Sequence, residues 1–475
     1  MKNLTYALLA LLLLQGCTQT TPIPDTQLSW EGKPRVVVMT DGEIDDRCSM
    51  VHFLLYANDV QVDAIIQSNS GFQRHGWSSE PWIEEQIAAY EMVLPNLRVH
   101  DPDYPSADEL RKAVYVGDED PTHVPEGVSF KTLLPGSEVL IDPTNWADTP
   151  GSDRLVEILL EEDPRPVFIQ CWGGGNTALR AFDKLKQEYP EAYDRAMSKV
   201  VMYCIWYQDG AGNYIERNHP KATLLLSHHF SGSWDYGTMT NSDNFIRQYL
   251  QNGKNPLGKF YVQPFISEGD TPAFLYALPN GLRSYEHPTY GGWGGRFYKV
   301  EGFENVYRDV NLGNLREWLE PAMRDFEARL HWCVTPEYEK ANHAPVIEVE
   351  EGLDRIVKSG EEVILTAKIS DKDPRDVEGA WRVRGTMWQQ KGRTRAWLDE
   401  DPEKRIEEYR TDWSQDIAGS YKGNINLEFI GKEQVRFVAP EVDEPQTIHI
   451  ILEAYDMAVP RLTSYARFIV TVIPN

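Results

Sequence analysis

The sequence predicts an α/β domain with a mostly parallel sheet flanked by helices, followed by an all-β, immunoglobulin-like sandwich. Between residue 30 and about residue 336, short β-branched runs alternate with helix-length segments, a pattern typical of parallel strands joined by crossover helices. After about residue 342, apolar and polar residues alternate in short runs separated by Asp, Gly and Pro, which indicates antiparallel strands. A chain of 475 residues is long enough for both parts.

The spacing of the apolar residues places the individual elements. In the first part we expect strands at residues 35–39, 60–68, 166–171, 199–205 and 260–266. Helices are expected at residues 45–57, 80–94, 106–114, 153–162, 176–189, 191–197, 241–252 and 315–332. In the second part we expect strands at residues 346–349, 362–369, 434–438, 447–454 and 466–473.

The N-terminus has the features of a bacterial lipoprotein signal peptide over residues 1–17. Lys2 supplies a positive charge, and residues 6–14 form an apolar stretch too short to span a bilayer in the mature protein. The segment ends Leu-Gln-Gly-Cys, so we expect Cys17 to carry a lipid and to anchor the exported protein in the outer membrane, facing the periplasm or the cell surface. Residues 18–29 would be a flexible tether. An ordinary secretory peptide is the alternative.

The composition argues against two classes of function. A formal net charge of −26 argues against nucleic-acid binding, because phosphates need a basic surface. Of the five cysteines, four follow Cys17, and their spacing fits no zinc site. A disulfide among these four remains open in an exported protein, since the sequence alone does not pair them.

An acidic turn follows the first predicted strand and carries Asp41, Glu43, Asp45 and Asp46. Open α/β sheets place their sites at the carboxyl ends of parallel strands. Four adjacent carboxylates cannot all stay ionised without a cation or strong hydrogen bonds, and such hard oxygen ligands suit Ca²⁺ or Mg²⁺. The alternative is an acidic helix N-terminus stabilised by the helix dipole.

Two further segments follow predicted strands. Residues 173–175 are glycines, which let a backbone approach a ligand closely, and Asn176 starts the next helix. A glycine turn capped by an asparagine is the alternative. Asn213, Glu216 and Asn218 lie among aromatic residues and supply the amide and carboxylate groups that sugar recognition needs. Taken alone, this second segment could also be a polar surface loop.

The last two segments lie beyond residue 266. Asp270 follows a predicted strand and precedes a helix, which returns a carboxylate to the same edge of the sheet. A glycine-rich loop over residues 286–296 then carries His287 and Trp293. Loops in this part of a sheet carry function more often than packing.

The acidic turn resembles the Asp-x-Asp-Pro-Gly-x-Asp-Asp motif of the nucleoside hydrolases. Asp41, Asp45 and Asp46 fall on its last three acids, while Met39 stands at the first. Nearly all of the mature chain resembles a family of exported bacterial proteins described as cellulose-binding, which have a nucleoside-hydrolase-like domain and a characteristic C-terminal domain. The resemblance implies a nucleoside-hydrolase-like α/β domain over residues 30–340 and a β-sandwich domain over residues 343–475.

The resemblance also implies a metal site. In the nucleoside hydrolases these positions bind Ca²⁺, so Asp41, Asp46, Asp270 and the backbone carbonyl of Asn176 would hold Ca²⁺, with Mg²⁺ as the alternative metal. Asp41 would in addition act as the general base that takes a proton from water. Gly269 stands where that family has a histidine that helps the leaving base, which implies a substrate other than a common nucleoside.

The sugar contacts and the proton donor complete the expected site. The resemblance implies that Asp45, Glu216 and Asn218 hold the sugar, with Asn213 as a weaker match. Trp293 lies in the loop that should close over the cleft. The proton donor to the leaving group must come from elsewhere, and the candidates are His287, Glu268 and His75, in that order.

The expected function is Ca²⁺-dependent hydrolysis of a furanosyl bond, N- or O-glycosyl, in glycan breakdown. The alternative is a lipoprotein that binds carbohydrate without turnover, and a third hypothesis is that the acids hold a purely structural cation. The expected partner is a carbohydrate or a nucleoside-like small substrate. We expect no nucleic-acid partner, and contact with a membrane only through the lipid anchor.

Overall fold

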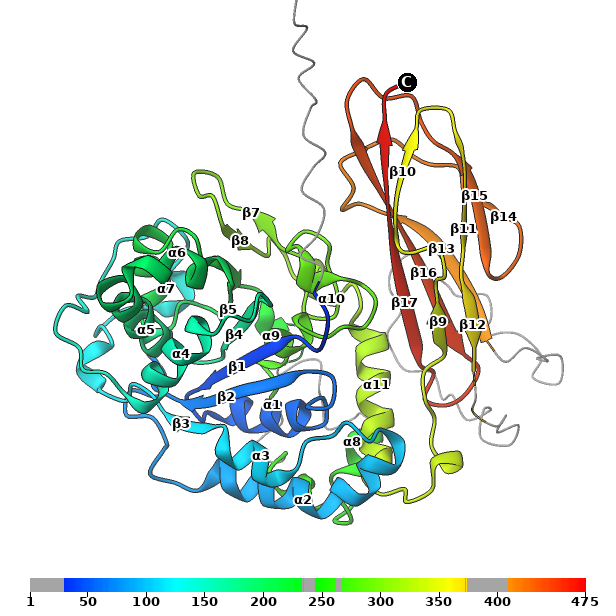
Figure 1. Ribbon diagram of the computed structural model, residues 1–475. Coiled ribbons are helices and arrows are strands. Elements are labelled where there is room, and N and C mark those ends of the chain that lie inside the picture. The colour runs from blue at the N-terminus through cyan, green and yellow to red at the C-terminus, as the bar shows by residue number, and fades with distance from the viewer. Residues whose placement is uncertain (1–29, 233, 235–243, 262–266, 372, 374–408) are drawn as a thin grey trace, which may run out of the picture.

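The computed structural model describes residues 30–232, 234, 244–261, 267–371, 373 and 409–475 (Figure 1). The expected signal peptide, Cys17 and the tether lie outside these residues. Within the described part, none of the helices has the length and apolar character needed to cross a membrane. The four cysteines in this part are buried and free.

An eight-stranded sheet forms the centre of the first part, in the order β3-β2-β1-β4-β5-β6-β8-β7. All neighbouring strands are parallel except β7, which runs antiparallel to β8 at one edge. The fold class predicted for this part is therefore confirmed. The strands are β1 (Arg35–Thr40), β2 (Gln61–Gln67), β3 (Val114–Val116), β4 (Val167–Cys171), β5 (Val200–Ile205), β6 (Thr223–Ser227), β7 (Tyr298–Lys299) and β8 (Val306–Arg308).

Helices cover both faces of this sheet (Figure 1). The α-helices are α1 (Ile44–Leu54), α2 (Trp82–His100), α3 (Ala107–Lys112), α4 (Pro150–Leu160), α5 (Asn176–Glu188), α6 (Pro190–Ser198), α7 (Ala211–Asn218), α8 (Asn244–Tyr249), α9 (Thr271–Tyr276), α10 (Gly313–Arg316) and α11 (Leu319–Trp332). Short 3₁₀ turns are η1 (Pro121–His123), η2 (Phe130–Thr132), η3 (Phe230–Gly232), η4 (Pro256–Lys259), η5 (Ser284–Glu286) and η6 (Tyr338–Lys340).

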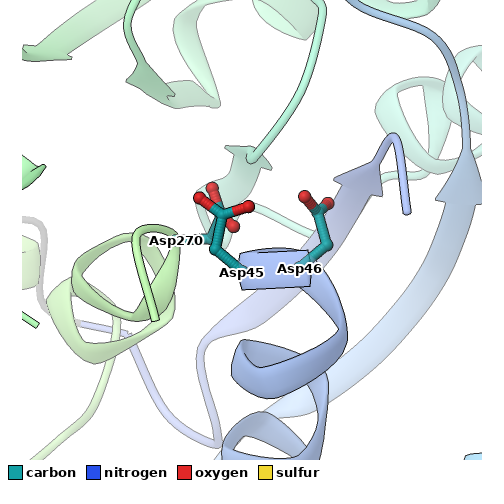
Figure 2. A group of neighbouring side chains, drawn as sticks. All are labelled: Asp45, Asp46 and Asp270. Carbon is teal, nitrogen blue, oxygen red and sulfur yellow. The ribbon is translucent and has the colours of Figure 1, made fainter. Parts of the chain in front are cut away.

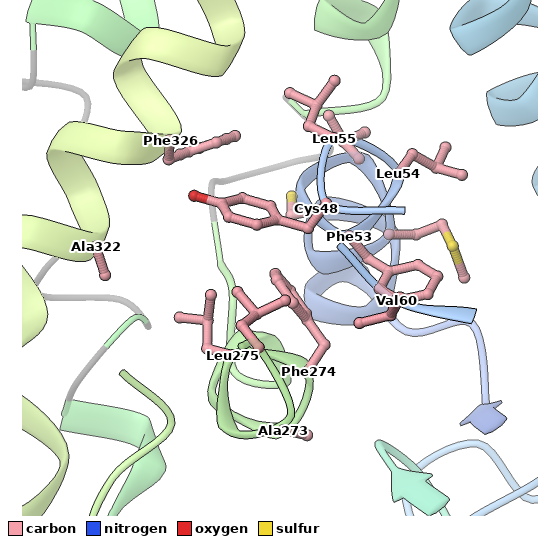
Figure 3. Packing of buried hydrophobic residues seen from close by; sticks show 14 of the residues in the cluster. Cys48, Phe53, Leu54, Leu55, Val60, Ala273, Phe274, Leu275, Ala322 and Phe326 are labelled. Carbon is pink, nitrogen blue, oxygen red and sulfur yellow. The ribbon is translucent and has the colours of Figure 1, made fainter. Parts of the chain in front are cut away.

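The side chains of β1 alternate between two apolar cores, as expected for a strand covered on both faces. Val36 and Val38 join the core under α1, α2, α9 and α11, whereas Val37 and Met39 join the core under α4, α5 and α6. In the first core, Phe53 of α1 packs edge-on against the ring of Phe274 of α9, with 5.7 Å between the ring centroids (Figure 3). This packing fixes α9 beside α1.

The second part consists of β-sheets packed around a separate core. A four-stranded sheet in the order β10-β17-β16-β13 faces a three-stranded sheet in the order β11-β15-β14, and β9 and β12 form a two-stranded pair. The predicted strand-rich fold is confirmed. The strands are β9 (Val346–Glu348), β10 (Asp354–Lys358), β11 (Glu362–Thr366), β12 (Lys368–Ser370), β13 (Tyr409–Asp416), β14 (Glu428–Phe429), β15 (Gln434–Val438), β16 (Gln446–Asp456) and β17 (Thr463–Ile473).

Several elements differ from the sequence-based expectations. The strand expected at residues 260–266 lies mostly outside the described residues. The helix expected at residues 315–332 is two helices, α10 and α11, with Trp318 in a non-helical conformation between them. The elements that were not predicted are β3, β6, β7, β8, β10, β13, β14 and α7. β6 is a short, continuous apolar run, and such a run has no period that distinguishes a strand from a buried helix.

A buried group of arginines joins the two parts. Arg467 of β17 is fully buried and donates to the carbonyl of Leu282 at 2.6 Å and to the carboxylate of Asp416 at 2.9 Å. Arg296 donates to the other Asp416 oxygen at 2.8 Å. Burial opposes ionisation of Asp416, but the two guanidinium groups outweigh it and lower the pKa of Asp416 to about 2. The loop that precedes β7 is thereby tied to the β-sheets.

We expect Arg467→Met to destabilise the protein by about 3–5 kcal/mol, because it removes one partner of a buried ion pair. Urea unfolding followed by tryptophan fluorescence measures the loss. The matched control is Arg436→Met, which removes a partly exposed arginine paired with Glu428 and should leave the unfolding midpoint nearly unchanged. Equal midpoints for wild type and Arg467→Met would show that the arginine group does not hold the parts together.

Candidate metal centre

The acidic turn is locked to the end of β1. Gly42 turns the chain with a φ of +77°, a left-handed conformation that favours glycine, and α1 begins two residues later. Asp46, in the first turn of α1, accepts hydrogen bonds from the Thr40 hydroxyl and from the backbone N–H of Asp41 at 3.1 Å. The carboxylate of Asp46 therefore points back toward the carboxyl end of the strand.

Asp270 comes to the same place from a distant part of the chain. It directly precedes α9 and is almost fully buried. Gly269 allows this approach, because a Cβ atom there would lie 2.5 Å from a carboxylate oxygen of Asp45 and 3.0 Å from the ring of Phe230. The histidine found at this position in the nucleoside hydrolases could not fit against Asp45 as it is placed here.

Three carboxylates converge at this point (Figure 2). Asp45, Asp46 and Asp270 each offer an oxygen within 4.8 Å of the others. Asp41 and Asp270 each have one buried carboxylate oxygen without a hydrogen-bond partner among the described residues. Buried carboxylate oxygens without donors, gathered from two segments, fit a hard divalent cation. Of the expected metal ligands, the structure thus brings Asp46 and Asp270 together, with Asp41 beside them.

The electrostatics of the cluster agree with this interpretation. Burial raises the pKa of Asp270 well above its usual value, and the charges of Asp46, Asp45 and Asp41 raise it further. The pKa of Asp46 is also well above normal, first because of burial and then because of its charged neighbours. Burial raises the pKa of Asp41 too, partly offset by a hydrogen bond with Asp46. A bound cation would relieve these penalties.

The glycine run packs directly against the acids. A Cβ atom on Gly173 would lie 2.7 Å from the Cβ of Asp41, so only glycine allows this approach. Asn176 is the first residue of α5, and its N–H donates to Asp209 at 2.8 Å. Its backbone carbonyl belongs to the first turn of α5, where carbonyls accept intrahelical hydrogen bonds. Metal binding by the Asn176 carbonyl stays a prediction.

The structure does not bring the other expected sugar contacts to the acids. Glu216 in α7 accepts from the Gly136 N–H at 2.8 Å and from the Asn213 amide at 3.2 Å. Asn218 ends α7, and its amide donates to the carbonyl of Tyr214 at 2.9 Å. None of the hydrogen bonds described for Glu216 and Asn218 involves Asp41, Asp45, Asp46 or Asp270. Glu216 and Asn218 instead form hydrogen bonds with backbone groups that lie next to them in the fold.

His287 and Trp293 also lie away from the acids. Trp293 is buried between the two parts of the chain, with its ring 6.5 Å from that of Tyr465. His287 hydrogen-bonds to the Thr289 hydroxyl at 2.8 Å and packs against Tyr307. The loop that was expected to close over the cleft is instead part of the contact with the β-sheets, which removes the geometric reason for His287 as the proton donor.

The two remaining donor candidates have different positions. Glu268 is fully buried and bonds to a ring nitrogen of His52 at 2.7 Å and to the Thr271 hydroxyl at 2.6 Å. His75 is exposed, in the loop that follows β2. Glu268 lies next to the site, but its carboxylate bonds to His52 and Thr271 in the core. Proton donation by His75 stays a prediction.

Sequence reasoning named His75 from the loop that follows β2, but it missed Gln73 and Trp77 as the residues of this loop that contact the acidic turn. Gln73 donates to Glu43 at 3.2 Å and accepts from the Trp77 indole at 2.9 Å. Trp77 in turn covers Gly42, whose Cβ position would lie 3.0 Å from Trp77 atoms. The available signal was a run of polar and aromatic residues directly after a strand, at the edge where sites form.

We expect the acid cluster to contribute a loss of stability to the metal-free protein as pH rises from about 4 toward neutrality. Carboxyl groups whose pKa is higher in the folded state bind more protons there than in the unfolded state, so the free energy of unfolding falls as they ionise. Added Ca²⁺ should therefore raise the thermal unfolding midpoint more at about pH 7 than at about pH 5. Differential scanning calorimetry with chelator or with Ca²⁺ measures this.

The double variant Asp46→Asn, Asp270→Asn should abolish the Ca²⁺-dependent rise, while the exposed Asp142→Asn should keep it. Asp209, with a pKa of about 6, and Asp456, with a pKa of about 7, also destabilise the folded state as pH rises, so only the Ca²⁺-dependent difference is diagnostic. A Ca²⁺ response that survives the double variant would place the cation elsewhere.

Comparison with known proteins identifies the family. Residues 35–297 match the family model "Cellulose-binding Sde182, nucleoside hydrolase-like domain", and residues 399–472 match "Cellulose-binding protein Sde0182, C-terminal domain". A solved structure with a TM-score of 0.74 and 25% identity covers 94% of this chain and 100% of its own. It is described as a nucleoside hydrolase-related hypothetical protein from Saccharophagus degradans that is associated with carbohydrate metabolism. No curated protein matches. The chain belongs to the Sde182 family, whose description combines cellulose binding with a nucleoside-hydrolase-like domain.

Proposed function

We propose that the carboxyl edge of the eight-stranded sheet binds carbohydrate around a divalent cation, with Ca²⁺ as the first candidate and Mg²⁺ as the second. The observation that carries this proposal is the pair of buried, unpartnered oxygens on Asp41 and Asp270, next to Asp45 and Asp46. The family description, which names cellulose binding, supports carbohydrate as the ligand class.

Each acid has a distinct part in this proposal. Asp46 is fixed by Thr40 and would hold the cation together with Asp41 and Asp270. Asp45 is less buried than the other three and can accept hydrogen bonds from sugar hydroxyl groups. When bound, the cation supplies positive charge that neutralises the carboxylates and attracts hydroxyl oxygens. Calcium suits such a site because it accepts a variable number of oxygen ligands.

Hydrolysis of a furanosyl bond is the second candidate function, and one observation favours it. Asp41 lies at the end of β1 with a free oxygen, and burial raises the pKa of its carboxyl group, which brings it closer to the range of a general base at neutral pH. That oxygen could accept a proton from a water molecule. The family description names cellulose binding, so binding without turnover is the first candidate.

One experiment separates these functions. Calorimetry with cellohexaose, with Ca²⁺ or with chelator, should show binding only when Ca²⁺ is present. Asp270→Asn should weaken that binding at least about tenfold, because it removes one of the anionic ligands and one hydrogen-bonding partner of the cluster. The exposed Asp142→Asn is the control. Binding that is equal with and without chelator would contradict a cation-dependent site.

A product assay on the same samples tests turnover. Nitrophenyl furanosides, inosine and cellohexaose are incubated with the full chain and Ca²⁺, and released sugar is measured. If hydrolysis occurs, Asp41→Asn should lower its rate by about a hundredfold to ten-thousandfold, the usual loss for a missing general base. Release of sugar that is unchanged in Asp41→Asn would remove Asp41 from the catalytic role.

A further inference from the structure

An aromatic wall, formed by Phe72, Trp206 and Phe230, begins directly beside the acid cluster. Phe230 is buried. A Cβ atom added to Gly269 would lie 3.0 Å from the ring of Phe230 and 2.5 Å from a carboxylate oxygen of Asp45, so the ring and the carboxylate flank the same glycine. The ring of Trp206 meets Phe230 edge-on, with 4.5 Å between centroids. The wall therefore starts at the carboxylates and leads outward from them.

The three rings of the wall differ in exposure. Phe230 is 4% exposed, the Trp206 ring is partly exposed, and Phe72 is 41% exposed. The rings of Phe72 and Trp206 lie 6.0 Å apart and are tilted by 37°. An exposed phenylalanine beside a partly exposed tryptophan leaves apolar ring surface in contact with water, at an edge of the sheet where ligands bind.

The backbone holds Trp206 in this place at a cost. Its φ is +58°, a left-handed conformation that is rare for bulky residues and that tends to occur at functional sites. The indole N–H donates to the carbonyl of His228 at 3.1 Å, which fixes the ring orientation. Lys131, an exposed residue, places its ammonium group 5.3 Å from the ring centroid of Trp206. A hydrogen-bond donor thus stands beside the apolar surface.

From this arrangement we infer that the aromatic wall is a subsite for the sugar rings of a glucan chain whose next unit lies at the acid cluster. Sugar rings present an apolar face of C–H groups and a rim of hydroxyl groups. Aromatic faces match the first, and Lys131, Asp45 and the cation match the second. A row of three neighbouring rings, two of which are accessible to solvent, suits a chain better than a single nucleobase. This inference rests on the proposed carbohydrate binding.

The test uses the full chain, Ca²⁺ and cellohexaose in calorimetry. Phe72→Ala truncates an exposed ring, and Trp206→Gly replaces a strained residue with the residue that best adopts its conformation, so both variants should fold. Each should weaken cellohexaose binding about tenfold, while the Ca²⁺-dependent rise in the unfolding midpoint stays as in wild type. Phe429→Ala is the matched control, because Phe429 is 56% exposed but lies on β14 of the second part.

The outcomes separate this inference from the function on which it rests. If wild type binds cellohexaose with Ca²⁺ and both wall variants bind it equally well, the subsite is overturned and the proposed function stands. Wild type that does not bind cellohexaose overturns both. Tighter binding of uridine or inosine than of cellohexaose, lost in Phe72→Ala, would make the wall a platform for a base and would also overturn the inference.

Discussion

The structure around the site depends on holding like charges together. Asp41, Asp45, Asp46 and Asp270 repel one another wherever they ionise. Burial raises the pKa of Asp41, Asp46 and Asp270, and the charges of their neighbours raise it further at Asp46 and Asp270. A fold that keeps such groups side by side must be rigid enough that the elements carrying them cannot separate. The acids come from only two places, the turn after β1 and the start of α9.

A chain of hydrogen bonds ties these two places together behind the acids. The Ser49 hydroxyl on α1 bonds with the Thr271 hydroxyl on α9 at 3.2 Å, and Thr271 bonds with Glu268, which pairs with His52 of α1. The His52 ring is stacked on Phe326 of α11, with 3.6 Å between the ring centroids. Polar contacts and ring packing thus hold α1, α9 and α11 as one block. These contacts oppose the repulsion between the carboxylates, which would otherwise separate α1 from α9.

Part of this arrangement can be predicted from the sequence alone. The acidic turn after β1, the glycine run after β4 and Asp270 before α9 each follow or precede an element with a clear apolar pattern, and parallel strands bring their carboxyl ends to one edge. Those local rules, together with the resemblance to the nucleoside hydrolases, placed Asp46 and Asp270 in one cluster without any knowledge of tertiary contacts. The family assignment and the fold class followed from the same segments.

The remaining site predictions required tertiary information. The spacing of Glu216 and Asn218 fits a sugar contact, but it does not show that these side chains bond to the backbone at Gly136 and Tyr214. A glycine-rich loop with Trp293 suggests a flap over a cleft, yet the β-sheets of the second part bury it through Arg467 and Asp416. Phe72 and Trp206 come together only because the loops after β2 and β5 meet at the edge of the sheet.

The central claim is that the acid cluster holds a divalent cation, and diffraction tests it most directly. Crystals grown in Ca²⁺, measured with anomalous scattering, should show a dominant peak within about 2.3–2.6 Å of carboxylate oxygens from both the β1 turn and Asp270. The same crystals soaked in chelator should lose the peak. Well-ordered acidic side chains at saturating Ca²⁺ with no peak between them would contradict the account.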